Sequence, residues 1–189
     1  DEFFANVAEN QNALPYSPQT GVYNTNATAY QFFRDNTKAE RATSIEGGYR
    51  IRRGAVEGSL TLFNVAYRNR LIGVSVCPLT ATCVSSFANV GSVTSRGAEG
   101  LLAVTLAPGL SPTTSAAYTR ATLDNDYASG RTDTVRARGK RVVDTPQLLG
   151  NAQLRYQNKG FAAQLGARHV SERYFSILNS ADSKVPAYT

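Results

Sequence analysis

The chain has 189 residues, which suits one domain, and a formal net charge of +6 at pH 7. Residues 131–141 hold five basic side chains and one acidic one, so they supply +4 of that charge. The excess is local, so it does not argue for a nucleic-acid-binding domain, and we expect no nucleic-acid partner. No stretch approaches about 18 consecutive apolar residues, which excludes a membrane-spanning helix.

The first part of the chain alternates strands with a long polar loop. Residues 3–8 are predicted to form a short strand, and residues 10–38 a loop rich in aromatic side chains, with a helical turn or two within 29–41. Residues 42–52 form the next predicted strand, which places Ile45 on one face and Glu46 and Arg50 on the other. A tight turn follows at residues 53–54.

Residues 56–76 are predicted to form one long strand. Its apolar residues change parity, from Leu60 and Leu62 to Phe63 and Val65, which predicts a bulge near Leu62. This strand far exceeds the roughly 9–11 residues that a bilayer requires, so we expect it to project beyond a membrane.

Residues 77–87 are a predicted loop that holds both cysteines, Cys77 and Cys83. A lone pair in one small loop indicates a disulfide in an oxidising compartment, with two free thiols as the alternative. A zinc site would require more ligands, and the chain has a single histidine.

Residues 88–106 show the clearest alternation in the chain. One parity is apolar from Ala98 to Leu106, whereas the other is small or polar and carries Glu99. Such a strand has lipid or a core on one side and water on the other. A short turn at residues 108–109 leads to a predicted strand over 112–124.

The last third repeats the pattern. A polar loop over residues 125–144 contains the basic run, and strands over 146–157 and 161–174 flank a tight turn at 158–160. Arg155 and Arg168 fall on the polar parity of these strands, and His169 falls on the apolar one. A loop over 176–184 precedes residues 185–189, which begin another strand.

Long and short connections alternate throughout the chain, so an antiparallel meander places all long loops at one end. This sorting is typical of transmembrane β-barrels. The sequence therefore predicts an all-β, antiparallel up-and-down transmembrane β-barrel. Seven strands and a stub do not close a barrel, because an open edge is not viable in lipid. We therefore expect residues 1–189 to be part of one barrel domain of a longer chain.

One motif lies in the strand predicted over residues 88–106: Asn89-Val90-Gly91 is followed by Arg96-Gly97-Ala98-Glu99. It resembles the N-x-G and G-x-E signature of strands in the C-terminal half of TonB-dependent outer-membrane receptors, and several other segments resemble that family in the same order along the chain. Weaker matches lie at Glu40 with 44–50 (SIEGGYR), and at 60–70, 145–147, 168–174 and 185–189. The resemblance covers about residues 39–189.

The resemblance implies a barrel of about 22 strands around an N-terminal plug, with the plug and the closing strands absent from residues 1–189. It implies uptake of a scarce ligand across the outer membrane of a Gram-negative bacterium, powered by the TonB–ExbB–ExbD complex through the plug. A ferric siderophore or similar iron chelate is the expected ligand, with vitamin B12 or a carbohydrate as alternatives. No cofactor, metal site or catalytic residue is expected.

Three sets of side chains are candidates for a role. The basic run would attract an anionic ligand or contact lipopolysaccharide phosphates, and its alternative is a solvated loop; it comprises Arg131, Arg136, Arg138, Lys140 and Arg141. The loop aromatics Tyr23, Tyr30 and Phe33 would stack on a ligand or pack among the loops. The polar-parity residues are expected to face the lumen in structural ion pairs, with each other or with the plug; they are Glu46, Arg50, Glu99, Arg155 and Arg168.

A different class of function is a small outer-membrane barrel enzyme or adhesin, for example a lipid hydrolase that uses His169 with a nearby serine. No nucleophile elbow or oxyanion motif accompanies that histidine, so a position at the barrel rim is the preferred interpretation. The length of residues 56–76 and the unfinished last strand favour the transporter.

Overall fold

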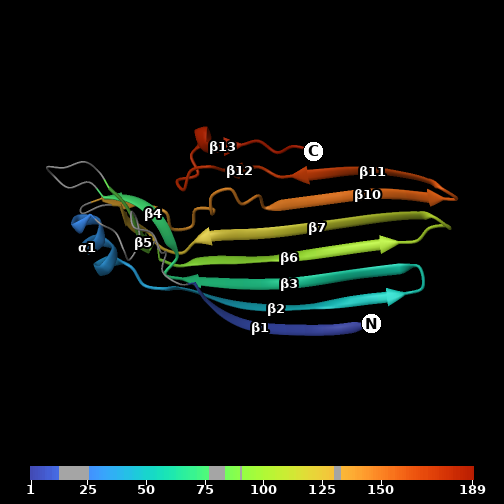
Figure 1. Ribbon diagram of the computed structural model, residues 1–189, viewed down its shortest axis with the longest axis horizontal. Coiled ribbons are helices and arrows are strands. Elements are labelled where there is room, and N and C mark those ends of the chain that lie inside the picture. Colours follow the sequence, from blue (N-terminus) through green and yellow to red (C-terminus); the bar gives the residue numbers. More distant parts are fainter. Residues whose placement is uncertain (13–25, 77–83, 90, 130–132) are drawn as a thin grey trace.

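A computed structural model describes residues 1–12, 26–76, 84–89, 91–129 and 133–189. Seven long strands form one antiparallel sheet, in the order β1-β2-β3-β6-β7-β10-β11 (Figure 1). These strands are β1 (Glu2–Asn12), β2 (Glu40–Arg53), β3 (Val56–Arg68), β6 (Val93–Val104), β7 (Leu110–Leu123), β10 (Leu148–Asn158) and β11 (Phe161–Val170). The sheet is a meander, as the sequence predicts.

Short elements gather beyond one end of this sheet. They are α1 (Ala27–Asn36), the hairpin of β4 (Leu71–Val76) with β5 (Val84–Asn89), and the hairpin of β8 (Tyr127–Ser129) with β9 (Asp133–Val135). Later in the chain, β12 (Arg173–Tyr174) pairs with β13 (Lys184–Val185), and a 3-10 turn covers Ala181–Ser183. None of the helices within the described ranges is long and apolar enough to cross a bilayer.

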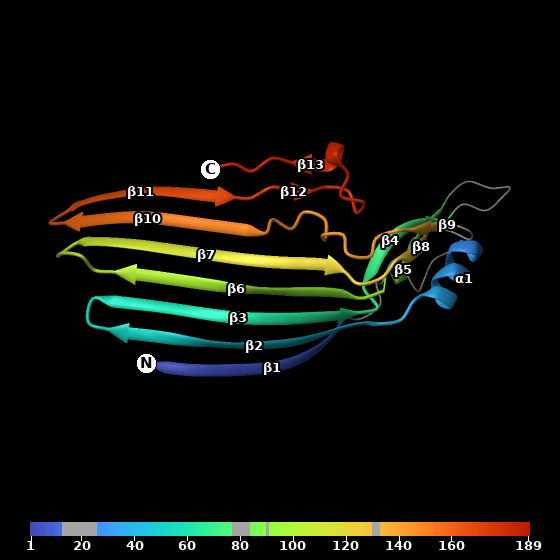
Figure 2. The ribbon, with the colours of Figure 1, turned by 180° about the vertical axis from the view of Figure 1, so that it is seen from behind.

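The two ends of the sheet differ as the loop lengths predict. The tight turns after β2, β6 and β10 lie together at one end, whereas α1 and both hairpins lie at the other (Figure 2). Glycines with positive φ occupy these turns, at Gly54, Gly109 and Gly160. We call the two ends the turn end and the loop end.

Residues 56–76 do not form one bulged strand, so that prediction is wrong. The register of β3 against both neighbours runs without interruption through Leu62 and Phe63, which face Gly47 and Glu46 on one side and Ala98 and Gly97 on the other. The strand ends at Arg68, where Asn69 takes a positive φ of 55°, and β4 pairs with β5 instead. The apolar residues change parity because they serve opposite faces of the sheet: Leu60 and Leu62 lie on one face, and Phe63 and Val65 on the other.

Other predicted boundaries change in the same way at the loop end. The predicted strand over 88–106 is divided between β5 and β6, and the predicted strand over 161–174 between β11 and β12. The polar loop over 125–144 contains the β8–β9 hairpin. Within residues 185–189, where a further strand is predicted, Tyr188 forms an isolated bridge to Val170, with backbone hydrogen bonds of 2.9 and 3.0 Å.

Register and alternation divide the sheet into two faces of different chemistry. The face that we call apolar presents large hydrophobic side chains on all seven strands, among them Phe3, Ile45, Leu60, Leu102, Tyr118, Leu154 and Leu165, all exposed in this structure. The face that we call polar carries Glu46, Arg50, Glu99, Arg155 and Arg168. One face therefore suits hydrocarbon and the other suits water.

The apolar residues form a band that runs obliquely across the strands. Ile51 of β2 and Ala167 of β11 lie in the same cross-strand row. From that row the band extends toward the loop end in β2, as far as Ile45, but toward the turn end in β11, as far as Phe161. A horizontal band crosses strands in this way when the strands tilt, as they do in barrels.

An added positive charge should affect stability differently on the two faces. In the full-length protein refolded in lipid bilayers, Leu165→Arg should lower the free energy of unfolding by about 2–4 kcal/mol, because Leu165 is 75% exposed on the apolar face. Gln164→Arg, one residue earlier on the polar face, should change it by less than about 1 kcal/mol. Denaturant titration measures both, and equal losses would contradict the assignment of faces.

Candidate functional site

A small hydrophobic core closes the loop end on the polar face of the sheet. Tyr67, Val93 and Leu123 lie in one cross-strand row there, and Ala137 packs on them fully buried. Partly buried side chains from the loops complete this core: Tyr127, Val135, Val142 and Ile177. Burial raises the pKa of the Tyr127 phenol. The loops that carry the basic run therefore fold inward, over the mouth of the polar face.

The basic run divides into exposed and anchored side chains. Arg136 and Arg138 are exposed, on either side of buried Ala137, and the Arg138 N–H donates to Asp126 Oδ1 at 2.8 Å. Lys140 is half-buried, and its backbone pairs with Leu123. Arg131 lies outside the described residues. Two guanidinium groups of the run, those of Arg136 and Arg138, thus face solvent at the loop end.

Arg141 instead holds two loop segments together, with its side chain only 18% exposed. Its guanidinium donates to the Glu172 carbonyl at 3.1 Å and lies over the Tyr174 ring, 5.3 Å from the centroid. Its backbone N–H donates to Asn179 Oδ1 at 2.5 Å. Glu172 also binds Lys184 at 2.6 Å, and this hydrogen bond raises the pKa of Lys184. A role in loop architecture accounts for Arg141 without a ligand.

The aromatic side chains of the first loop are divided in the same way. Helix α1 begins after Asn26, whose Oδ1 accepts the Ala29 N–H at 3.1 Å, a standard N-cap. Tyr30 is exposed on this helix, whereas Phe33 is 3% exposed and presents no open ring face. Tyr23 lies outside the described residues, as do Cys77 and Cys83 with their predicted disulfide.

A network of polar side chains fastens the loop end of β2 to the junction of β3 with β4. Glu40 is 7% exposed, and its carboxylate accepts hydrogen bonds from Arg70 Nη1 at 2.9 Å and from the Leu71 N–H at 3.1 Å. Asn89, the last residue of β5, joins the segments next to these strands, because its Nδ2 donates to the Lys38 carbonyl before β2 and the Asn69 carbonyl after β3, at 3.1 and 2.5 Å. In the sequence, Glu40 and Asn89 stand out only as motif residues, and no local pattern predicts this network.

The glycines of the family-like motifs have equally local explanations. Gly97 lies directly opposite Phe63, and an added Cβ would come within 2.0 Å of the Tyr118 carbonyl oxygen and 2.8 Å of the Phe63 ring. Gly91 has a φ of 85°, and its carbonyl accepts the Arg70 N–H at 2.9 Å. The N-x-G and G-x-E residues thus set strand register and the β5–β6 junction.

The predicted lumen-facing residues share the polar face but do not bond to one another. Within the described ranges, Arg50 pairs with Glu2 at 3.8 Å, Glu46 accepts from Asn6 at 3.2 Å, and Arg155 donates to Gln157 at 2.8 Å. The polar face is hollowed between these strands, and one hollow of about 390 Å³ is lined by Thr61, Glu99 and Asn151 among others.

The single histidine and the acidic side chains are the remaining candidates for a catalytic or metal-binding role. His169 lies on the apolar face near the end of β11, and its Nδ1 is 2.9 Å from Thr189 Oγ1. Among the described side chains, no group of three or more His, Cys, Asp or Glu is arranged to hold a metal ion.

Comparison with known proteins identifies the family. The family model "TonB dependent receptor-like, beta-barrel" matches residues 2–189. The chain belongs to the TonB-dependent receptor family. This family and the similar solved structures are receptors and transporters, not enzymes. This agrees with the prediction of a transporter from the sequence.

Several solved structures share the fold of this receptor chain. The copper transporter OprC matches with a TM-score of 0.70 and 14% identity, over 98% of this chain and 27% of that one. The ferric citrate transporter FecA gives 0.68 and 21%, over 98% and 26%. The ferric yersiniabactin uptake receptor FyuA from Yersinia pestis gives 0.65 and 17%, over 98% and 26%. The receptor chain therefore spans about a quarter of the length of these structures. No curated protein matches its sequence.

The Glu40 network predicts a stability effect that a surface ion pair does not have. Glu40→Ala in the full-length receptor should lower the free energy of unfolding by about 2 kcal/mol, because it leaves Arg70 and the Leu71 N–H without their acceptor. Hydrogen exchange should quicken at the Arg70 and Leu71 amides, which donate to the Gly91 carbonyl and to Glu40. Glu57→Ala, which removes the exposed partner of Arg52, should cost less than about 1 kcal/mol. Similar losses in both variants would show that the network does not support the loop end.

Proposed function

We propose that this receptor lies in the outer membrane of a Gram-negative bacterium and takes up a ferric siderophore or similar iron chelate, with energy supplied through TonB. The observation that carries the proposal is a receptor-family barrel wall whose loop end exposes the guanidinium groups of Arg136 and Arg138 above a polar, hollowed face. Two similar solved structures, FyuA and FecA, are named for ferric chelates. Residues 1–189 form part of a single barrel domain in this proposal, and coupling to the TonB–ExbB–ExbD complex runs through a plug that the described residues do not include.

The exposed basic side chains would act on ligand capture. Positive charge at a barrel mouth raises the local concentration of anionic ligands and hence the association rate. Arg136 and Arg138 carry this role, with Tyr30 of α1 as the exposed aromatic that could stack on a chelate. Arg141 and Phe33 support the loops instead, because the structure buries or pairs them. Vitamin B12 and carbohydrate remain alternative ligands, and their uptake is one outcome of the experiment below.

Uptake of radioactive iron tests the proposal directly. The full-length gene is expressed in a Gram-negative strain that lacks its own iron-chelate receptors, and iron-55 is supplied as citrate, catecholate or hydroxamate complexes. At least one complex should enter the cells, and a protonophore should abolish entry because TonB coupling uses the proton gradient. Uptake of vitamin B12 or an oligosaccharide, with no iron complex transported, would contradict the iron assignment.

The charge of the loop end predicts a salt-dependent association rate. Arg136→Ser with Arg138→Ser should slow the binding of the transported anionic chelate at low salt and have little effect near 0.5 M salt, where screening acts within about 4 Å. Lys159→Ser, which removes a positive charge at the turn end, is the matched control and should leave the rate unchanged. Stopped-flow binding across a salt series measures all three proteins. If the association rates of the double variant and the wild type depended on salt concentration to the same extent, Arg136 and Arg138 would not steer the ligand. The basic run would then be a solvated loop.

A further inference from the structure

Two arginines lie directly opposite each other on the apolar face, at the loop-side edge of its hydrophobic band. Arg96 of β6 and Arg120 of β7 are cross-strand partners, and both side chains are exposed. The next positions on the same face toward the turn end are Ala98 and Tyr118, which also pair. Side chains directly opposite have Cβ atoms about 5 Å apart, and like charges at that spacing repel.

No acidic side chain among the described residues relieves this repulsion. Neither arginine takes part in an ion pair or a side-chain hydrogen bond within the part of the chain that the structure describes. The nearest carboxylate along that face of β7, Asp124, accepts a hydrogen bond from Thr94 at 2.8 Å. A second cross-strand pair, Arg41 with Arg68, lies further toward the loop end on the same face. Arg41 reaches Glu9 only at 4.0 Å.

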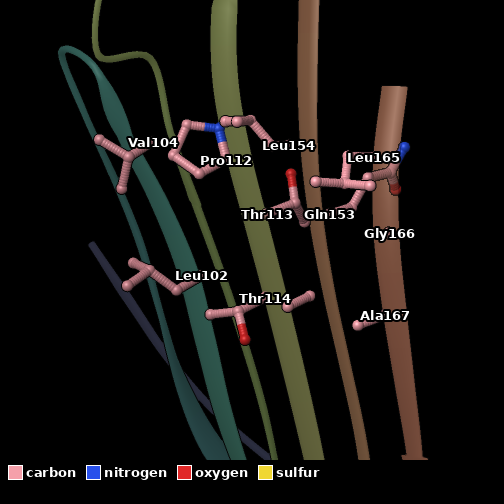
Figure 3. A pocket seen from close by; sticks show the side chains of 11 residues that line it. Leu102, Val104, Pro112, Thr113, Thr114, Gln153, Leu154, Leu165, Gly166 and Ala167 are labelled. Atoms are coloured by element: carbon pink, nitrogen blue, oxygen red, sulfur yellow. The ribbon is translucent and has the colours of Figure 1, made fainter. Parts of the chain in front are cut away.

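A groove of small residues leads from the arginine pair along the apolar face. A first hollow, of about 400 Å³, has Ala98, Gly100 and Ala116 among its lining, with Tyr118 beside them. Leu102 and Thr114 line both this hollow and a second one of about 520 Å³. The second continues between Pro112, Leu154 and Leu165 (Figure 3). Its lining is almost entirely apolar, so an acyl chain fits it and a polar ligand does not.

We propose that Arg96 and Arg120 bind a lipid phosphate at the outer surface of the barrel, with an acyl chain of the same lipid in the adjoining groove. Guanidinium groups bind phosphate through charge-assisted, often bidentate hydrogen bonds, and one anion between two cations removes their mutual repulsion. The loop-side position of the pair selects a phosphorylated lipid of the outer leaflet. This inference rests on the proposed outer-membrane placement but not on the identity of the transported ligand.

Native mass spectrometry of the full-length receptor tests the site. The delipidated protein in detergent micelles is titrated with bisphosphorylated lipid A. Arg96→Gln with Arg120→Gln should weaken binding roughly tenfold or more, since each lost charge-assisted hydrogen bond removes a sizeable part of the affinity. Arg155→Gln with Arg168→Gln makes the same charge change on the polar face and should leave binding unchanged. Ala116→Leu, which fills the groove without altering charge, should weaken binding as well.

The choice of ligand separates a lipid from a free anion. Lipid A without phosphate should bind wild type and the Arg96/Arg120 variant equally weakly. Inorganic phosphate at millimolar concentration should not displace bisphosphorylated lipid A, and displacement would overturn the lipid assignment. Equal binding of phosphorylated and phosphate-free lipid A to the wild type would overturn the proposal even if the glutamine variant failed to fold. Heat-modifiable electrophoretic mobility checks folding, and Arg96→Lys with Arg120→Lys should retain part of the affinity. Iron uptake measured in parallel keeps the two proposals distinguishable.

Discussion

The structure depends on one continuous antiparallel register that holds seven strands between two different environments. Strand partners follow one another from β1 to β11 with no bulge, so each residue's parity decides whether it meets the apolar or the polar face. A slip of one residue would exchange the two faces and move Glu99 to the apolar face, which now carries Gly100 and Leu102. Two cross-strand pairs oppose such a slip: Phe4 with Gly48, and Phe63 with Gly97. In each pair the aromatic ring lies over the glycine, where a Cβ atom would clash with it.

The loop end is built on this register by a different kind of interaction. There the loops are held over the barrel mouth by a small hydrophobic core on the polar face and by networks of polar side chains. The Glu40 network anchors the start of β2 to the β3–β4 junction, and Arg141 with Asn179 anchors the last loops to each other. Both are partly sheltered from water, which gives their hydrogen bonds more strength than exposed ion pairs such as Arg52 with Glu57 possess.

The role of a charged residue in a barrel wall therefore depends on its face and its partners. A basic run in a loop suggests ligand binding, yet one of its members, Arg141, holds two loop segments together, whereas Arg136 and Arg138 are exposed at the loop end. Conversely, Arg96 belongs to a family-like strand motif but lies on the apolar face, where its cross-strand partners are Asn64 of β3 and another arginine, Arg120 of β7. The chemistry of a positive side chain is the same in each case, and its partners and its face determine what it does.

The sequence by itself determined the elements whose signal is local. Period-two alternation predicted the seven strands and their two faces, and glycine-containing turns predicted which connections are short, because side-chain parity and turn geometry depend on neighbours in the chain. The tertiary structure alone decided where β3 ends, that Phe33 is buried, and that Glu40 and Asn89 meet Arg70 and Asn69. These features depend on residues that are up to 51 positions apart and on a core assembled from several loops, so no window of the sequence contains their cause. The parity change at Leu62 is an example. The apolar residues of β3 do change parity, but the strand has no bulge. Toward the loop end, β3 instead packs its other face against a small core, which only the tertiary structure reveals.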